Sequence, residues 1–180
     1  MRIAIIGLPG SGKGSQARLL SETFSIPRIC AGEMLRELGK EKSALGRKVK
    51  ETLKRGELVP DDLVLALLKQ RLKKSDTRRG FVLDGIPRTL NQVRMFRKLF
   101  SLDKVFLLRV AEKVAVARLL KRGREDDTPE QIKKRLEIFN REIGQIAELC
   151  RELGVLVEIH TAGDSVQATH QRILAELNQE

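Results

Sequence analysis

Residues 7–15 read Gly-Leu-Pro-Gly-Ser-Gly-Lys-Gly-Ser, and this stretch decides the fold of the chain. It follows the apolar run 3–6 and leads into a helix-like pattern over 16–20. Strand, glycine-rich loop and helix form the context that a phosphate-binding loop requires. The residues Gly7, Gly12 and Lys13 match the spacing G-x-x-x-x-G-K-S, and one extra residue, Gly14, separates Lys13 from the Ser15 hydroxyl. A turn that merely needs glycine would leave the lysine and the hydroxyl unexplained, so we expect phosphate groups here.

Length and composition indicate one globular domain. The chain has 180 residues, of which 41% are hydrophobic and 33% charged, enough for a real core. Because no apolar run approaches membrane-spanning length, we expect neither a signal peptide nor a transmembrane helix, and a cytoplasmic protein. Cys30 and Cys150 are far apart and form no C-x-x-C pair. We therefore expect neither a disulfide nor a zinc site.

The net charge of +11 indicates an anionic partner. Nucleic acid, a membrane surface and a nucleotide would each fit such a charge. The chain has no Trp, no Tyr and only six Phe, so a binder of single strands that stacks bases on aromatic rings is poorly supported. We expect nucleotides as partners, and neither a membrane nor nucleic acid. The oligomeric state does not follow from the sequence, and a monomer is the default expectation.

Strand-like and helix-like segments alternate along the chain, which predicts an α/β fold with a doubly wound sheet of five parallel strands. The expected strands are residues 2–7, 26–29, 81–83, 104–110 and 155–159. The expected helices are residues 13–24, 31–38, 43–55, 61–73, 89–100, 113–122, 129–152 and 164–178. Ligands of such a sheet bind at the carboxyl ends of its strands. The helical insert 30–59 is expected to be a small arm.

Several arginines stand where this topology places the site. They are Arg36, Arg88, Arg118, Arg122, Arg124 and Arg135. Arginine binds phosphate with two parallel hydrogen bonds and keeps its proton, and phosphoryl transfer needs positive charge around the moving group. A surface role would suit any one of them, but their number beside a phosphate-binding loop favours a common function.

Asp84 ends an apolar strand, as does the carboxylate that holds Mg²⁺ in many phosphate-loop proteins. It would bind the ion directly or through water, with the hydroxyl of Ser15 nearby and Glu33 as a weaker candidate for the same shell. Its alternative role is to cap the following turn.

The motifs together resemble the adenylate kinase family, and more broadly the nucleoside monophosphate kinases. They are residues 7–15, Ala31-Gly-Glu-Met-Leu-Arg36, Gly56-Glu-Leu-Val-Pro60, Phe81-Val-Leu-Asp-Gly-Ile-Pro-Arg88, Arg118-Leu-Leu-Lys-Arg122 and Lys134-Arg-Leu136. They follow the family order and cover nearly the whole chain. The resemblance implies reversible phosphoryl transfer from MgATP to AMP, which gives two ADP.

The resemblance also implies site residues. The catalytic set would be Lys13, Arg88, Arg122, Arg124 and Arg135. ATP would contact Gly10, Ser11, Gly12, Lys13, Gly14, Ser15, Arg118 and Gly163. AMP would contact Ala31, Arg36, Glu57, Leu58, Val59, Gly85, Ile86, Pro87, Arg88, Gln92, Arg124 and Arg135. It further implies a core of residues 1–29, 60–121 and 128–180, an acceptor-binding arm of 30–59 and a short lid of 122–127, without the zinc ribbon of long-lid members.

Two functions within the family remain possible, and they differ in the base of the acceptor nucleotide. Ala31 stands where adenylate kinases usually carry Thr and favours a UMP/CMP kinase, whereas the Gln92 amide favours adenine. A lost hydroxyl forfeits about 0.5–1.5 kcal/mol, and an unpaired amide in a closed site costs about 1–3 kcal/mol. We therefore predict AMP. Outside the family, the alternatives are a nucleotide-dependent binding module and a nucleic-acid binder. The Asn-Lys-x-Asp motif of a guanine-nucleotide switch is missing.

Overall fold

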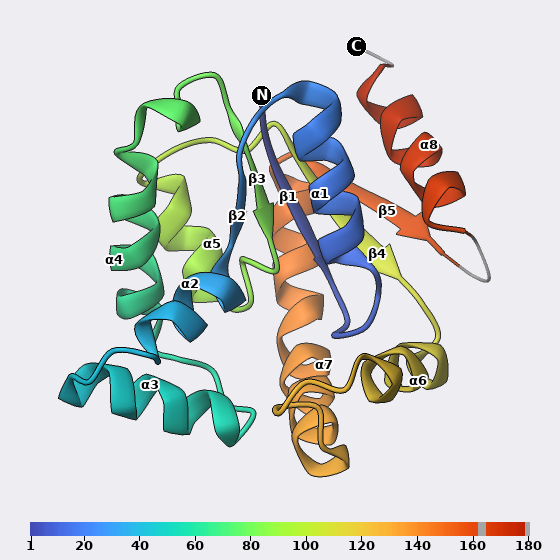
Figure 1. Cartoon of the computed structure of the whole chain (residues 1–180). Coiled ribbons are helices and arrows are strands. Elements are labelled where there is room, and N and C mark those ends of the chain that lie inside the picture. The colour runs from blue at the N-terminus through green and yellow to red at the C-terminus, as the bar shows by residue number, and fades with distance from the viewer. Residues whose placement is uncertain (162–164, 179–180) are drawn as a thin grey trace.

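The chain folds around a five-stranded parallel sheet in the order β2-β3-β1-β4-β5 (Figure 1). The computed structural model describes residues 1–161 and 165–178. The strands are β1 (Arg2–Gly7), β2 (Arg28–Cys30), β3 (Phe81–Asp84), β4 (Lys104–Arg109) and β5 (Leu156–His160). The central position of β1 follows from its sequence, because its residues 3–6 are apolar and almost fully buried on both faces. The predicted α/β sheet of parallel strands is confirmed.

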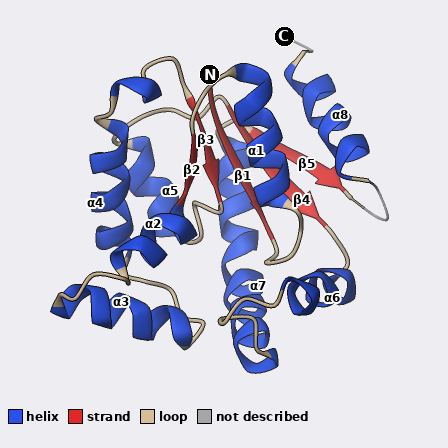
Figure 2. Cartoon of the chain, viewed as in Figure 1, coloured by secondary structure: helices blue, strands red, loops and turns tan. Residues whose placement is uncertain are grey.

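Helices cover both faces of the sheet (Figure 2). They are α1 (Lys13–Phe24), α2 (Ala31–Leu38), α3 (Ala44–Lys54), α4 (Asp61–Leu72), α5 (Leu90–Arg97), α6 (Glu112–Arg122), α7 (Pro129–Glu152) and α8 (Val166–Leu177). Side chains alternate along β1: Ile3 and Ile5 pack with α1 and α8, whereas Ala4 and Ile6 pack with α4, α5 and α7. Two apolar layers therefore hold the sheet rigid beneath the loops at its carboxyl edge.

Helices α2 and α3, in the segment predicted to be an arm, lie beyond the carboxyl end of β2, and the loop between α6 and α7 is short (Figure 1). The capping box at Thr128, with Pro129 in the first turn, begins α7 as the sequence predicts. No helix in the described parts of the chain is long and apolar enough to cross a membrane.

Some element bounds differ from the prediction. Strand β2 starts at Arg28 rather than residue 26, because Pro27 has no N–H to donate to a neighbouring strand. Helix α5 ends at Arg97 rather than residue 100. The apolar periodicity continues to Phe100, whose ring stacks on that of Phe96 at 5.9 Å, although the backbone has already turned. The remaining bounds agree with the prediction or differ from it by one or two residues.

Candidate active site

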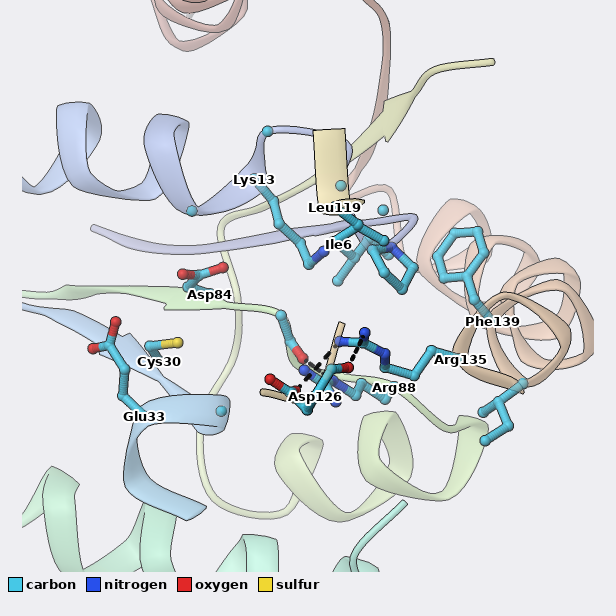
Figure 3. A pocket seen from close by; sticks show the side chains of 18 of the residues that line it. Ile6, Lys13, Cys30, Glu33, Asp84, Arg88, Leu119, Asp126, Arg135 and Phe139 are labelled. Atoms are coloured by element: carbon cyan, nitrogen blue, oxygen red, sulfur yellow. Dashed lines mark hydrogen bonds and ion pairs between the residues drawn. The ribbon is translucent and has the colours of Figure 1, made fainter. Parts of the chain in front are cut away.

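A cavity of about 430 Å³ opens where β1, β2 and β3 end. Gly7, Cys30 and Asp84 are the last residues of these strands, and all three line it. The carboxyl edge of a doubly wound sheet is where such folds bind ligands, and the volume suits a small molecule. Figure 3 shows side chains from the end of β1, the start of α1, the end of β3 and α7 gathered around this space.

The loop between β1 and α1 can form only with glycine at two positions. Gly10 and Gly12 have φ of 85° and 92°, a region that side chains disfavour. A Cβ at Gly10 would lie 2.3 Å from the Ala115 carbonyl oxygen, so the loop packs directly on the backbone of α6. A Cβ at Gly12 would meet no described atom within 4 Å, which leaves this side of the loop open to a ligand. The loop therefore has the backbone that a phosphate cradle needs.

Lys13 reaches from the first turn of α1 into the cavity. Its Nζ donates a hydrogen bond to the Leu8 carbonyl oxygen at 3.0 Å. Burial lowers the pKa of Lys13 to about 8, and the nearby Arg88 adds to this effect while Asp84 opposes it. A Cβ placed on Gly85 would lie 3.5 Å from both the Lys13 Cε and the Arg88 Nη2, so the two cations flank one glycine. Such a pair favours an anion between them.

Arg88 lies deep in the same cavity. Its Nε donates to the Gly85 carbonyl oxygen at 2.8 Å. Burial lowers the pKa of Arg88, and the neighbouring charges of Arg135 and Arg36 lower it further. Within residues 1–161 and 165–178, no carboxylate forms a salt bridge with Arg88. A half-buried guanidinium with cationic neighbours and no salt bridge to a described carboxylate is suited to bind an anionic ligand.

Asp84, at the end of β3, is paired with a residue that the sequence did not single out. Arg28 on β2 donates from Nε and Nη2 to the Asp84 Oδ2 at 3.0 and 2.7 Å, and also binds Glu33 at 2.9 Å. Burial alone would lower the pKa of Arg28, but the hydrogen bonds to Asp84 and Glu33 raise it. A Cβ at Gly14 would lie 3.4 Å from the same Oδ2, so this carboxylate borders the phosphate loop.

These groups are of the kind that Mg²⁺ prefers. Asp84, Glu33 and Ser15, which were predicted to lie near Mg²⁺, all line the cavity and carry oxygen atoms of the type that this ion binds. The Asp84 carboxylate is 6% exposed and is already held at one oxygen by Arg28. A shared carboxylate of this kind suits an ion that keeps most of its water, as Mg²⁺ does.

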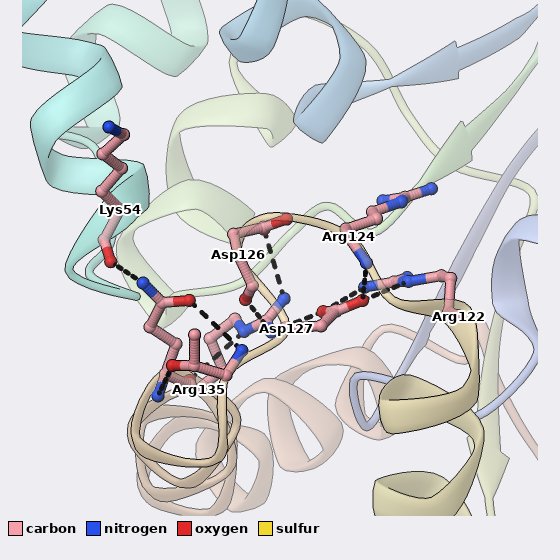
Figure 4. A network of polar contacts seen from close by, with 8 residues as sticks. Lys54, Arg122, Arg124, Asp126, Asp127 and Arg135 are labelled. Carbon is pink, nitrogen blue, oxygen red and sulfur yellow. Dashed lines mark hydrogen bonds and ion pairs between the residues drawn. The ribbon is translucent and has the colours of Figure 1, made fainter.

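The loop 123–128 is held by a carboxylate without solvent contact. Asp127, whose side chain is 0% exposed, accepts hydrogen bonds from Arg122 at 2.7 Å and from Arg135 at 2.8 Å (Figure 4). Burial alone would raise the pKa of Asp127, but these hydrogen bonds lower it to about 2. Asp126 contacts Arg135 through both its side chain and its carbonyl oxygen. The two aspartates thus fix two of the predicted catalytic arginines.

The arm touches the start of α7 directly. Lys134 donates to the Glu57 carboxylate at 2.7 Å. The Gln131 amide donates to the Lys54 carbonyl oxygen (Figure 4). The hydrogen bonds from Lys134 and Arg55 lower the pKa of Glu57. The predicted arm is therefore in direct contact with the first two turns of α7.

Most of the predicted site residues line this one cavity. They are Gly10, Gly12, Lys13, Gly14, Ser15, Arg36, Glu57, Leu58, Asp84, Gly85, Pro87, Arg88, Arg118, Arg122, Arg124 and Arg135. Others are buried and are not among the lining residues: Ser11, Ala31, Val59, Ile86 and Gln92. Gly163 lies outside the described residues.

Gln92, predicted to pair with the acceptor base, is 2% exposed. Its Oε1 accepts from the Arg88 backbone N–H at 2.8 Å, and its Nε2 donates to the Asp61 carboxylate at 2.8 Å. A base would have to share this amide with both partners, so its part in base recognition stays a prediction.

The sequence analysis missed Arg28 and Asp127. Arg28 stands at the start of a three-residue strand, and only the pairing of β2 with β3 brings it to Asp84. For Asp127 a signal was present, since Asp126-Asp127 lies among the arginines of the short loop and directly precedes a Thr-Pro helix start. A carboxylate beside several arginines is a candidate partner for them.

Comparisons with known proteins agree with this geometry. The family model described as "Adenylate kinase" matches residues 5–155. The chain is 38% identical over 175 residues to adenylate kinase 1 of a Nostoc species, which covers 94% of this chain and 95% of that protein. It is 40% identical over 172 residues to the adenylate kinase of Xanthomonas oryzae pv. oryzae, which covers 91% and 92% of the two chains. With its phosphate loop and arginine-lined cavity, this chain belongs to the adenylate kinase family and is a nucleoside monophosphate kinase.

Proposed function

We propose that the protein transfers the terminal phosphoryl group of MgATP to AMP and forms two ADP. The observation that carries this proposal is the convergence of Lys13, Arg36, Arg88, Arg122 and Arg135 on one cavity beside the phosphate loop. An oxygen of the acceptor phosphate attacks the γ-phosphorus, and the bond to the bridging β-phosphate oxygen breaks. That acceptor oxygen is already anionic at neutral pH, so the step needs no side-chain base and depends on positioning and positive charge.

The donor would lie along the phosphate loop. The backbone of residues 10–15 and the Lys13 ammonium would hold its phosphates, with Arg118 on its outer side. Asp84 and the Ser15 hydroxyl would hold Mg²⁺ through its water shell. The ion supplies charge neutralisation and orients the β- and γ-phosphates when it is bound.

The acceptor would enter between the arm and β3. Arg36 and Arg88 would bind its phosphate, and the backbone of residues 57–59 would line its base. The loop 122–127 would then add Arg124 to Arg122 and Arg135 around the transferring group and exclude water. We propose that the arm and this lid close over bound nucleotides, since the like charges in the cavity repel one another until phosphate separates them.

A single assay tests this function. ADP formation is measured with AMP, CMP, UMP and dCMP side by side at equal ATP and Mg²⁺ concentrations. We expect AMP to give the highest kcat/KM. If CMP or UMP surpassed AMP, the UMP/CMP kinase reading favoured by Ala31 would replace ours.

The lowered pKa of Lys13 predicts a pH dependence of ATP binding. With a pKa of about 8, Lys13 loses its proton in the empty site as the pH rises through that value. Bound phosphate favours the charged form, so binding takes up a proton there, and the affinity for ATP should fall about tenfold between about pH 7 and pH 9. Calorimetric titrations in two buffers of different ionisation enthalpy measure this proton uptake directly.

The variant Lys13→Met is the control for this titration. It should bind ATP weakly and take up no proton over the same range. A wild-type affinity that stayed constant from about pH 7 to pH 9 would show that Lys13 is fully charged in the empty site.

A further inference from the structure

Arg28 joins two carboxylates on the wall of the cavity where Mg²⁺ is expected. Its Nε and Nη2 donate to the Asp84 Oδ2 at 3.0 and 2.7 Å. Its Nη1 and Nη2 donate to the Glu33 carboxylate at 3.2 and 2.9 Å. The Arg28 side chain is 19% exposed and the Asp84 side chain only 6%, whereas Glu33 is 54% exposed. On the Asp84 side the ion pair is therefore well shielded from water, and its charges matter more than those of a surface pair.

The parallel pairing of β2 with β3 brings these groups together. Arg28 lies opposite Val82 in this register, and Cys30 lies opposite Asp84. Side chains two residues apart share a face of a strand, so the long Arg28 side chain only has to span this offset to reach Asp84. Glu33 lies in the first turn of α2, which follows β2 directly. Figure 3 shows Asp84 and Glu33 near Cys30, where the two strands end.

The guanidinium of Arg28 already supplies the positive charge that a divalent ion would otherwise supply here. Two neighbouring carboxylates repel each other, and a cation between them removes that cost. The same cation disfavours a second positive ion at Asp84 and Glu33. In residues 1–161 and 165–178, no cluster of three or more His, Cys, Asp or Glu is suited to hold a metal ion. A divalent ion without a nucleotide is therefore poorly held at this wall.

Arg28 neutralises Asp84 without occupying all of it. Its hydrogen bonds reach only Oδ2, and no described residue donates a hydrogen bond to Oδ1. Because Asp84 lines the cavity, Oδ1 can accept hydrogen bonds from the water shell of an ion. The carboxylate is thus able to serve an ion that arrives with further ligands of its own.

We propose that Arg28 is the resident counter-cation of Asp84 and Glu33, which keeps free divalent ions from these carboxylates and admits an ion that is bound to ATP. The proposal rests on the place that the proposed function gives to Mg²⁺ beside Asp84. Phosphate oxygens bring both ligands and negative charge, and these outweigh the charge of Arg28. An Arg28 that served only the fold would leave the affinity for free divalent ions unchanged when it is replaced.

The matched variants Arg28→Gln and Arg18→Gln test this. Glutamine removes the charge but keeps a polar side chain. Arg18 also lines the cavity, but it is exposed, and neither a hydrogen bond nor a salt bridge joins it to Asp84 or Glu33. Arg18→Gln therefore removes the same charge from the same cavity without freeing a carboxylate.

The probe is Mn²⁺ alone, which prefers the same oxygen ligands as Mg²⁺. It is added to the nucleotide-free protein, and the unbound ion is followed by electron paramagnetic resonance. We expect Arg28→Gln to lower the dissociation constant for Mn²⁺ about tenfold, and Arg18→Gln to change it less than about twofold, because the charge of an exposed side chain is screened. In thermal melts, about 10 mM MgCl₂ should raise the melting temperature of Arg28→Gln by about 3–6 °C and that of the wild type by at most about 1 °C.

A double variant shows whether the gained ion is held by Asp84. Arg28→Gln/Asp84→Asn replaces the ion pair by two neutral amides, so no buried charge is left without a partner. Its affinity for Mn²⁺ should return to the wild-type value. Arg28→Lys keeps a cation beside Asp84 and covers the case that Arg28→Gln does not fold. Its single ammonium cannot hold both carboxylates as the planar guanidinium does, so we expect the affinity for Mn²⁺ to rise about threefold.

Three results would overturn the proposal. One is an equal affinity for Mn²⁺ in the wild type and in the folded Arg28 variants, which would make Arg28 purely structural. The second is an equal gain in Arg18→Gln, which would assign the effect to the overall charge of the cavity. The third is a gain that persists in the double variant, which would place the ion away from Asp84. A wild-type protein that binds MgATP but forms no ADP with any nucleoside monophosphate would contradict the proposed function alone, because the Mn²⁺ titrations use no nucleotide.

Discussion

Arg88→Lys is expected to lower kcat for ADP formation by about a thousandfold, the upper range for removal of one charge-stabilising donor group. Arg88 is anchored at its backbone and at Nε and lines the cavity, so under the proposed function its other N–H groups would bind the acceptor phosphate as a pair. Lysine keeps the charge but offers a single mobile ammonium, which cannot form two parallel hydrogen bonds. Steady-state assays of ADP formation at saturating ATP and varied AMP measure the effect.

The control for this prediction is Arg94→Lys. Arg94 lies in α5, six residues after Arg88, and is exposed, so its replacement should leave kcat and the melting temperature unchanged. The melting temperature of Arg88→Lys should also stay close to that of the wild type, because Arg88 forms no ion pair with any described residue. Parallel losses of activity and melting temperature would show that Arg88 supports the fold rather than the reaction.

Asp127→Asn should lower kcat about a hundredfold, the size expected when catalytic groups are displaced by about 1 Å. The buried carboxylate accepts from both Arg122 and Arg135 at Oδ1, and from the Arg122 Nε at Oδ2. An amide has one acceptor oxygen and no charge, so at least one of these hydrogen bonds is lost and the arginines are no longer held in place for the transferring group. The affinity for AMP and ATP measured separately should change less than kcat, because the lid acts on the assembled complex.

Two further measurements bear on this prediction. Asp126→Asn is the matched control, since Asp126 contacts Arg135 at 3.4 Å and is partly exposed. It should reduce kcat far less.

The pKa of Asp127, lowered to about 2, also predicts how the stability of the protein depends on pH. The stability contributed by its ionised form is complete above the ordinary carboxyl pKa of 3.8 and is lost as the pH falls toward 2. Asp127→Asn should remove this part of the acid unfolding profile; equal profiles would contradict the assignment.

Local sequence patterns determined the fold and the centre of the site. The phosphate loop, the alternation of strands and helices, and the helix start at Thr128-Pro129 depend on neighbouring residues, and backbone sterics, capping and periodicity act over that range. The arginines were found because topology brings the ends of parallel strands to one edge. For this reason most of the predicted site residues line a single cavity.

The tertiary structure alone decided which charged groups pair with one another. Arg28 binds Asp84 from 56 residues away, and Asp61 binds Gln92 from 31 residues away. Periodicity specifies which face of an element is buried, but not which distant side chain will contact that face. Because a buried charge or amide without a hydrogen-bond partner costs free energy, packing selects the pairings that leave none unsatisfied. The sequence by itself therefore determined where phosphate is handled, whereas only packing determined how Arg88, Asp84 and the lid arginines are held there.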